Sequence, residues 1–314
     1  MSANAEPAVH RLARGTPSAV LARYVRSKDK RAGDEVAVAE AGARAQIGVI
    51  GGSGLYAFLT GPVEEVVVET PYGLPSDPLV IGHIGGRSVA FVARHGRDHR
   101  FPPHRVPYRA NLWALHALGV RQVLAPCAVG SLHPKLGPGV LVVPDQLVDR
   151  TSGRDQTFYD GPGAVHVPFA DPYCPDGRDV TLSAALDSGW KAIDGGTVVV
   201  IEGPRFSTRA ESQWFLTNGW SLVNMTGHPE AVLARELAVC YTPLALVTDR
   251  DAGIESEGEP VTQEEVYRVF GQNVDRLREL LFEVIARLPA ERTCPCSTAL
   301  AGTLADPAAR LQGH

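Results

Sequence analysis

Two aspartates end a short apolar run in "PLALVTDRDAG", from Pro243 to Gly253. In an extended chain successive side chains alternate between faces, so Asp249 and Asp251 are predicted to face one object. Three kinds of partner suit such a pair: a hard metal ion, a glycosidic bond that needs an acid and a base, or a polar ligand with hydrogen-bond donors. The spacing alone is compatible with all three.

A glycine-rich stretch, "IGVIGGSGLY", begins at Ile47 and includes the first predicted strand. Glycines after a strand let backbone N–H groups approach an anion, and Ser53 adds a hydroxyl donor. Gly51, Gly52 and Gly54 lack the Gly-x-Gly-x-x-Gly spacing of a dinucleotide site, and the following residues favour a strand over a helix. The stretch therefore predicts an anion contact or a plain packing turn, and no dinucleotide site.

A cationic segment, "ARHGRDHRFPPHRVPYRAN", runs from Ala93 to Asn111. Guanidinium groups offer paired donors that match phosphate oxygens, so an anion is the natural partner, whereas the histidines lack a helical metal-ligand spacing. Most charge runs are solvated loops. Arg94 and His95, however, directly follow the apolar run "VAFVA", where a ligand site at a strand end would lie. The basic residues of the segment are Arg94, Arg97, Arg100, Arg105, Arg109, His95, His99 and His104.

Composition limits the class of protein. The chain has 314 residues, of which 44% are hydrophobic and 21% charged, as in ordinary globular proteins. A formal net charge of −5 without a basic stripe argues against a nucleic-acid partner. No apolar stretch is long enough to span a bilayer and no signal-peptide core is present, so we expect no membrane partner and a cytoplasmic location.

Five cysteines are scattered along the chain, and the last two form "TCPCS". This is not the dense, even framework of a secreted disulfide scaffold. Cys294 and Cys296 alone are weak evidence for zinc, which needs four ligands. We therefore expect them to be tail residues, with a redox pair as a lesser alternative, and we expect no metal site.

Strand and helix patterns alternate between two ends that are poor in core-forming residues. The pattern predicts an N-terminal extension over 1–45, one domain over 46–288 and a C-terminal tail over 289–314. Short β-branched runs alternate with helical patterns, and Thr208 and Thr262 each precede a glutamate by three residues, as at the start of a helix. We predict an α/β fold: a single domain with a central twisted mixed sheet flanked by helices, and ligands at the strand ends.

Seven separated motifs occur in one order: "GVIGGSGLY", "ARHGRDH", "AVGSL", "DRTSGRDQTFYDG", "IEGPRFSTRAES", "NMTGHPEAVLARE" and "TDRDAG". Together they resemble the 5'-methylthioadenosine phosphorylases of the trimeric purine nucleoside phosphorylase family. The resemblance extends from about Ile47 to about Ile285 and covers neither end of the chain. It implies a nucleoside phosphorylase fold and phosphorolysis, in which inorganic phosphate is a co-substrate and no cofactor takes part. A 5'-modified adenosine and phosphate would give adenine and a 5-modified ribose 1-phosphate.

The resemblance also implies roles for individual positions. Family members often have threonine where Ser53 and Cys127 stand; serine keeps the hydroxyl group and cysteine loses it. His166 would reach into the pocket of a neighbouring subunit, which implies a homotrimer or a dimer of trimers. The implied phosphate ligands are Ser53, Arg94, His95, Cys127, Ala128 and Thr226; the implied nucleoside contacts are Phe206 on the base, Met225 on the ribose, Asp249 and Asp251 at the purine, and His99, His166, Gln263 and Val266 around the 5' substituent.

The chemistry of glycosyl transfer suits these residue types. Positive charge grows on the sugar in the transition state, while the leaving purine gains negative charge and departs more easily if its N7 receives or shares a proton. Asp249, at the end of a buried strand, is placed for that role, so the aspartate pair is interpreted as a purine reader with catalytic function. Other interpretations remain open: a general purine nucleoside or methylthioinosine phosphorylase, whose members carry asparagine at the base-reading position, and a non-catalytic nucleoside-binding protein.

Overall fold

The computed structural model describes residues 44–52, 55, 58–59, 61–161, 163–252 and 261–305. Most of the expected N-terminal extension, Ser53 and the last residues of the expected tail lie outside the described residues. The strands are β1 (Ile47–Gly51), β2 (Glu64–Val66), β3 (Leu79–Ile84), β4 (Arg87–Ala93), β5 (Gln122–Ser131), β6 (Leu141–Val143), β7 (Gln146–Arg150), β8 (Ala192–Asp194), β9 (Thr197–Ile201), β10 (Leu222–Asn224) and β11 (Cys240–Asp249). The helices are α1 (Tyr108–Ala117), α2 (Pro175–Asp187), α3 (Arg209–Thr217), α4 (Gly227–Glu236) and α5 (Gln263–Arg287), with short 3₁₀ turns η1 (Pro103–Arg105) and η2 (Pro295–Thr298).

The described strands form one mixed sheet in the order β2-β3-β4-β1-β5-β10-β9-β7, and a branch of β11, β6 and β8 leaves it at β5. β5 pairs in parallel with β1 and β11. Its last two residues, Gly130 and Ser131, pair in antiparallel fashion with Val223 and Leu222 of β10. The sheet therefore divides at the carboxyl end of β5. Such a division leaves room for a ligand beyond the strand ends.

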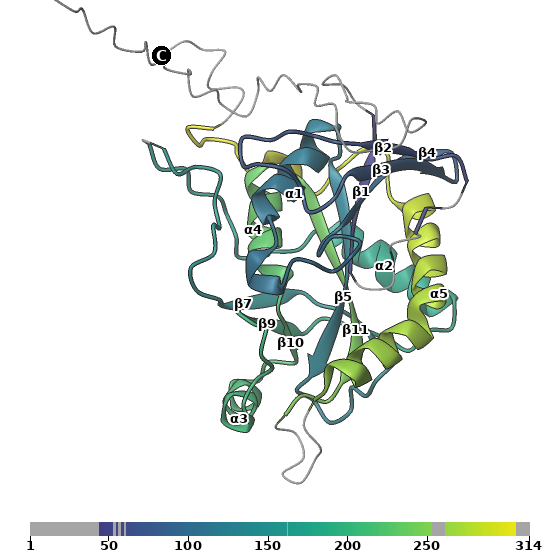
Figure 1. Ribbon diagram of the computed structural model, residues 1–314, viewed down its shortest axis with the longest axis vertical. Helices are drawn as coiled ribbons and strands as arrows, with labels where there is room; N and C mark the ends of the chain where they lie inside the picture. Colours follow the sequence, from purple (N-terminus) through teal and green to yellow (C-terminus); the bar gives the residue numbers. More distant parts are fainter. Residues whose placement is uncertain are drawn as a thin grey trace, which may run out of the picture.

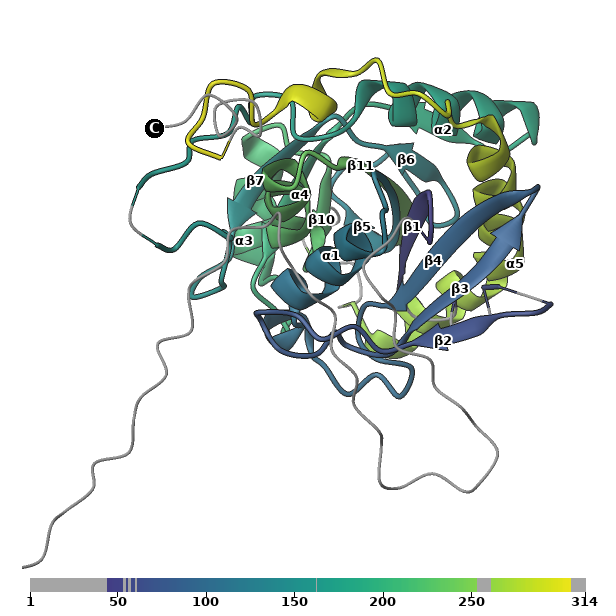
Figure 2. The ribbon, with the colours of Figure 1, turned by 90° about the horizontal axis from the view of Figure 1, so that it is seen from above.

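Helices cover both faces of the central strands. α1 and α4 pack on one face, and α2 and α5 pack on the other (Figure 1). Seen from above, the strands follow a curved path between the two helix pairs (Figure 2). Every residue of β11 is buried, as expected of a strand covered on both faces. The predicted α/β fold with a mixed central sheet is confirmed.

The predicted helix starts agree with the structure where a capping residue marked them. The hydroxyl of Thr208 accepts from the backbone N–H of Glu211 in a complete capping box, and Thr262 accepts from the N–H of Glu265. α2, β7 and β8 had no counterpart among the predicted elements. The buried residues of α2 are small (Gly177, Thr181, Ala184 and Ala185), so its sequence carries little apolar periodicity.

The expectation that the chain leaves the fold after Pro289 is wrong for the described residues 290–305. Cys294, Cys296 and Ala299 are all buried, and the guanidinium of Arg292 donates to the carbonyl of Ala238 at 2.6 Å. The segment lacks a helical or strand pattern, so its contribution to the core could not be recognised from periodicity. Among the described residues no helix combines the length and apolarity needed to cross a membrane.

Candidate active site

A cavity of about 380 Å³ opens where the sheet divides, at the carboxyl ends of β1, β4, β5 and β11 and beside the start of α5. Its volume suits a small polar molecule, because ligand pockets usually measure roughly 300–1,000 Å³. β1 pairs with β5 only as far as Leu124, so the two strands separate below the cavity. The residues implied by sequence that line it are Arg94, His95, His99, Cys127, Ala128, Phe206, Met225, Thr226, Asp249, Asp251, Gln263 and Val266.

Arg94 provides the positive charge at one end of the cavity. Its side chain is buried, and its guanidinium pairs with the carboxylate of Glu230 through Nε (2.5 Å) and Nη2 (3.1 Å). Nη1 donates to the carbonyl of Pro126 at 3.1 Å. Burial lowers the pKa of Arg94, but the charge and hydrogen bonds of Glu230 outweigh it and leave this pKa above its ordinary value. These bonds use three of the five N–H groups, so two can still donate to an anion.

His95 lies beside Arg94 as a neutral ring. Burial and the charge of Arg94 lower the pKa of His95 to about 4. Its Nδ1 lies 2.8 Å from the carbonyl of Phe101, which can only accept, so Nδ1 carries the proton and Nε2 is left as an acceptor. An acceptor beside an arginine suits a phosphate that still carries one proton.

Thr226 and Cys127 complete the described part of the anion end. The hydroxyl of Thr226 makes no capping bond to α4 and lines the cavity. The Cys127 thiol stays protonated near neutral pH, because burial raises its pKa to about 11, and it contacts the amide nitrogen of Asn224 at 3.8 Å. Cys127 thus supplies a weak donor at this end of the cavity. Ser53 lies outside the described residues, so its role stays a prediction.

Asp249 marks the other end of the cavity. The pairing of β11 with β5 shifts by one residue between Val247 and Asp249, which makes Thr248 a β-bulge. Bulges redirect side chains, and here the carboxylate of Asp249 accepts from the hydroxyl of Thr248 at 2.9 Å and from the backbone N–H of Asp251 at 3.0 Å. Burial raises the pKa of Asp249, while these two hydrogen bonds oppose the rise.

Asp251 reaches the cavity by a different route from the one predicted. β11 ends at Asp249, and Asp251 lies in a turn with φ of 40°, a left-handed conformation that aspartate tolerates. Its carboxylate accepts from the hydroxyl of Ser212 on α3 at 2.6 Å. The two aspartates do face one cavity, but the alternation of side chains along a strand is the wrong reason for it.

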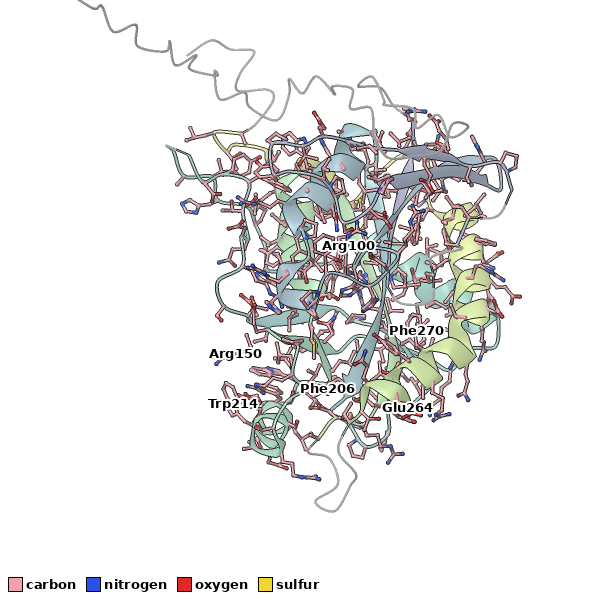
Figure 3. All side chains as sticks on the ribbon, in the orientation of Figure 1. Arg100, Arg150, Phe206, Trp214, Glu264 and Phe270 are labelled. Atoms are coloured by element: carbon pink, nitrogen blue, oxygen red, sulfur yellow. The ribbon has the colours of Figure 1, made fainter. Side chains whose placement is uncertain are left out.

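Aromatic and apolar side chains form much of the remaining cavity wall. Figure 3 shows Phe206 near the lower end of β5 and Phe270 on α5. His99 stacks on His95 with ring centroids 4.6 Å apart and meets Tyr267 edge-on at 6.0 Å. The amide nitrogen of Gln263 donates to the hydroxyl of Tyr267 at 2.9 Å. The start of α5 therefore supplies a wall with few unpaired polar groups.

The separation of the two ends suits a nucleoside. Cys127 lies at the anion end of the cavity. Gly130 lies at the other end, beside Asp249, because a Cβ atom at Gly130 would be 2.8 Å from the Asp249 carboxylate. Both positions belong to β5, so three residues of extended chain, about 10 Å, separate the ends. That distance leaves room for a pentose between an anion and a planar base.

The cationic segment does not act as one cluster. Arg97 binds Asp77 and Glu65, and Arg109 binds Asp155 and Asp160, all away from the cavity. Of its basic residues, only Arg94, His95 and His99 line the cavity. His166 is exposed in the segment between β7 and α2 and does not line the cavity of its own chain. Its contact with a neighbouring subunit stays a prediction.

Glu230, Tyr241 and Ser212 were not recognised from the sequence. The hydroxyl of Tyr241 donates to the carboxylate of Glu230 at 2.7 Å, so a buried chain of three side chains positions Arg94. A buried arginine needs an acidic partner, which was the available signal, but the sequence offers 35 acidic residues and no way to choose among them.

Comparison with known proteins identifies the family. The model of the phosphorylase superfamily matches residues 46–286. The chain belongs to this superfamily. It is 62% identical over 269 residues to a purine nucleoside phosphorylase of Streptomyces coelicolor, covering 82% of this chain and 95% of that protein. It is 60% identical over 248 residues to an S-methyl-5'-thioadenosine phosphorylase of Mycolicibacterium smegmatis, covering 79% and 93%.

Solved phosphorylase structures share the fold. A methylthioadenosine phosphorylase from an antarctic soil metagenomic library superimposes with a TM-score of 0.77 at 41% identity, covering 83% of this chain and 93% of that one. The Schistosoma mansoni methylthioadenosine phosphorylase in complex with adenine gives 0.74 at 39% identity, with coverage of 79% and 93%. The expected relationship to the nucleoside phosphorylases is confirmed.

Proposed function

We propose that this chain catalyses the phosphorolysis of 5'-methylthioadenosine, or of a closely related 5'-modified adenosine, to adenine and 5-methylthioribose 1-phosphate. The observation that carries the proposal is one cavity with a paired arginine at one end and two carboxyl groups, one buried and one half-buried, at the other. Phosphate is a co-substrate, and no cofactor takes part in the reaction.

The base end supports an aminopurine. A protonated carboxyl group at Asp249 can donate to N7 of adenine and accept from the 6-amino group through its other oxygen. Burial raises the pKa of both aspartates, which favours the protonated form that this arrangement needs. Proton donation to N7 then stabilises the leaving adenine.

The wall formed by α5 supports an apolar 5' substituent. Val266 and Phe270 line the cavity, and the polar atoms of Gln263 and Tyr267 hydrogen-bond to each other. A methylthio group can rest on such a surface without leaving a polar group unpaired, whereas a 5'-hydroxyl would need a partner.

The test measures release of adenine from 5'-methylthioadenosine and of hypoxanthine from 5'-methylthioinosine and inosine, each with and without phosphate. We expect phosphate-dependent release of adenine with the highest kcat/KM. A preference for inosine would favour the second candidate, a general purine nucleoside phosphorylase, which the name of the Streptomyces coelicolor relative suggests. Nucleoside binding without turnover would favour a binding protein.

We further propose a homotrimer or a dimer of trimers in the cytoplasm, with His166 completing the pocket of a neighbour. Its exposure on the segment before α2 supports a contact outside its own chain. Light scattering combined with activity measurements tests this, and a fully active monomer would contradict it.

A further inference from the structure

Four of the five cysteines meet far from the cavity. The Sγ atoms of Cys174, Cys240, Cys294 and Cys296 all lie within 4.8 Å of one another, and the side chains are buried. Each is a free thiol, and Cys240 and Cys294 have their sulfur atoms 3.3 Å apart. The four residues form a separate cluster, hereafter the cysteine cluster, without other hydrophobic members. The expectation of isolated tail cysteines is wrong, because Cys174 and Cys240 provide the second pair that Cys294 and Cys296 lacked in the sequence.

Three segments distant in sequence supply the cysteine cluster. Cys174 precedes the first turn of α2, and its backbone N–H donates to the carbonyl of Tyr241 at 3.0 Å. Cys240 is the first residue of β11. Cys294 and Cys296 belong to the start of η2, which the chain reaches after α5.

Backbone and side-chain hydrogen bonds fix these segments independently of the thiols. The amide of Gln122 donates to the carbonyl of Pro289 at 2.9 Å, and the hydroxyl of Thr293 donates to the carboxylate of Asp176 at 3.2 Å. The convergence of the four sulfur atoms is therefore built into the fold.

The geometry matches that of a structural zinc ion. Zinc binds four thiolates tetrahedrally at about 2.3 Å, which places the sulfur atoms about 3.8 Å apart. Sulfur ligands favour zinc over magnesium or calcium.

We propose that Cys174, Cys240, Cys294 and Cys296 bind one zinc ion in a closed tetrahedral site that fastens the segment after α5 to the starts of α2 and β11. With all four ligands from the protein, the metal has no position for substrate. Nine residues of extended chain separate Cys240 from Asp249, about 30 Å, so the site is structural and takes no part in phosphorolysis.

The first experiment measures zinc in the full-length protein, purified with a reductant and without chelators. We expect one zinc per chain by elemental mass spectrometry, released by a mercurial that attacks thiolates. The Cys294→Ser/Cys296→Ser variant should lose the zinc and melt about 10 °C lower. Cys127→Thr is the matched control, because it removes the one cysteine outside the cluster and should keep the full zinc content.

A second measurement does not depend on the variants folding. Cobalt(II) added to reduced, metal-free wild-type protein should give the intense visible absorption of tetrahedral thiolate coordination, and added zinc should abolish it. Zinc content far below one per chain together with no cobalt spectrum would overturn the proposal. So would an intact mass reduced by two hydrogens for each disulfide formed among these cysteines, or the recovery of iron in place of zinc.

Discussion

The carboxyl group of Asp249 is under two opposed influences. Burial raises its pKa, whereas the hydroxyl of Thr248 and the N–H of Asp251 donate to it and lower this pKa. A bound purine changes the balance, because N7 accepts a proton and the 6-amino group donates one. The group can thus select the base and assist its departure with the same two oxygens.

Asp249→Asn should lower kcat/KM for 5'-methylthioadenosine and shift the relative preference towards 5'-methylthioinosine. The amide can donate to the 6-oxo group, which a carboxyl oxygen repels, and a mismatched buried polar group costs roughly 1–3 kcal/mol. Asp251→Asn should act in the same direction but less strongly. The measurement is the ratio of kcat/KM for the two nucleosides; an unchanged ratio in both variants would make the aspartate pair structural.

The Arg94–Glu230 pair combines a functional and a structural role. Arg94→Ala should reduce kcat/KM for phosphate. The expected loss of transition-state stabilisation is roughly 1.5–3 kcal/mol, the value of a charge-assisted hydrogen bond. It should also destabilise the protein by about 3–5 kcal/mol, because the buried carboxylate of Glu230 loses its partner.

The double variant Arg94→Ala/Glu230→Gln separates these effects. Removing both charges should restore much of the stability, since the amide oxygen of the introduced glutamine can still accept from Tyr241, but it should not restore phosphate affinity. Arg97→Ala is the matched control, because its ion pairs lie outside the cavity and are partly exposed. Recovery of phosphate affinity in the double variant would remove Arg94 from the phosphate site.

At the scale of elements, Gly130 on β5 pairs with Asp249 on β11. A Cβ there would lie 2.8 Å from an oxygen of Asp249 and 3.3 Å from Cβ of Asp251. The bulge at Thr248 directs the Asp249 carboxylate to this point, so the absence of a side chain at residue 130 is part of the base site.

Gly130→Ala should displace the Asp249 carboxylate and reduce kcat/KM for the nucleoside at least tenfold, about 1.4 kcal/mol. Gly271→Ala on α5 is the control, because nothing lies within 4 Å of its Cβ position and alanine favours a helix by roughly 1 kcal/mol. Kinetics and thermal melting of both variants check this. Full activity of Gly130→Ala would show that the carboxylate has freedom to move aside.

The sequence predicted elements well where local signals were strong. Apolar runs located β1, β4 and β11, and capping residues located the starts of α3 and α5. It could not predict how strands from distant parts of the chain pair, so the bulge at Thr248 and the division of the sheet at β5 had no signal. The contacts of Glu230 and the convergence of the cysteines likewise depend on tertiary structure alone.

At the scale of the whole molecule, buried histidines make stability depend on pH. Burial is the largest cause that lowers the pKa of both His95 and His116 to about 4, against an ordinary value of 6.5. The unfolded chain therefore binds more protons than the folded chain between these values. The stability contributed by the neutral rings is complete above pH 6.5 and is lost as the pH falls towards 4.

Protonation of each histidine should lower the free energy of unfolding by on the order of 3 kcal/mol as the pH falls from 6.5 to 4. Melting temperatures between pH 7 and 4.5 measure the loss, and His116→Gln should flatten the curve without touching the cavity. Asp249 and the half-buried Asp251 act in the opposite direction, because their pKa values are raised. A curve equally steep in the wild type and in His116→Gln would contradict the assignment of His116.

The pairing of Arg94 with Glu230 has a consequence for the nucleophile. Among the residues described at that end, the arginine is balanced by its carboxylate, His95 is neutral and the Cys127 thiol is protonated, so an arriving phosphate meets a pocket of zero formal charge. Capture then relies on short-range donors, and its rate should vary little with ionic strength. The bound phosphate keeps its own negative charge, which remains directed at the sugar carbon where positive charge develops.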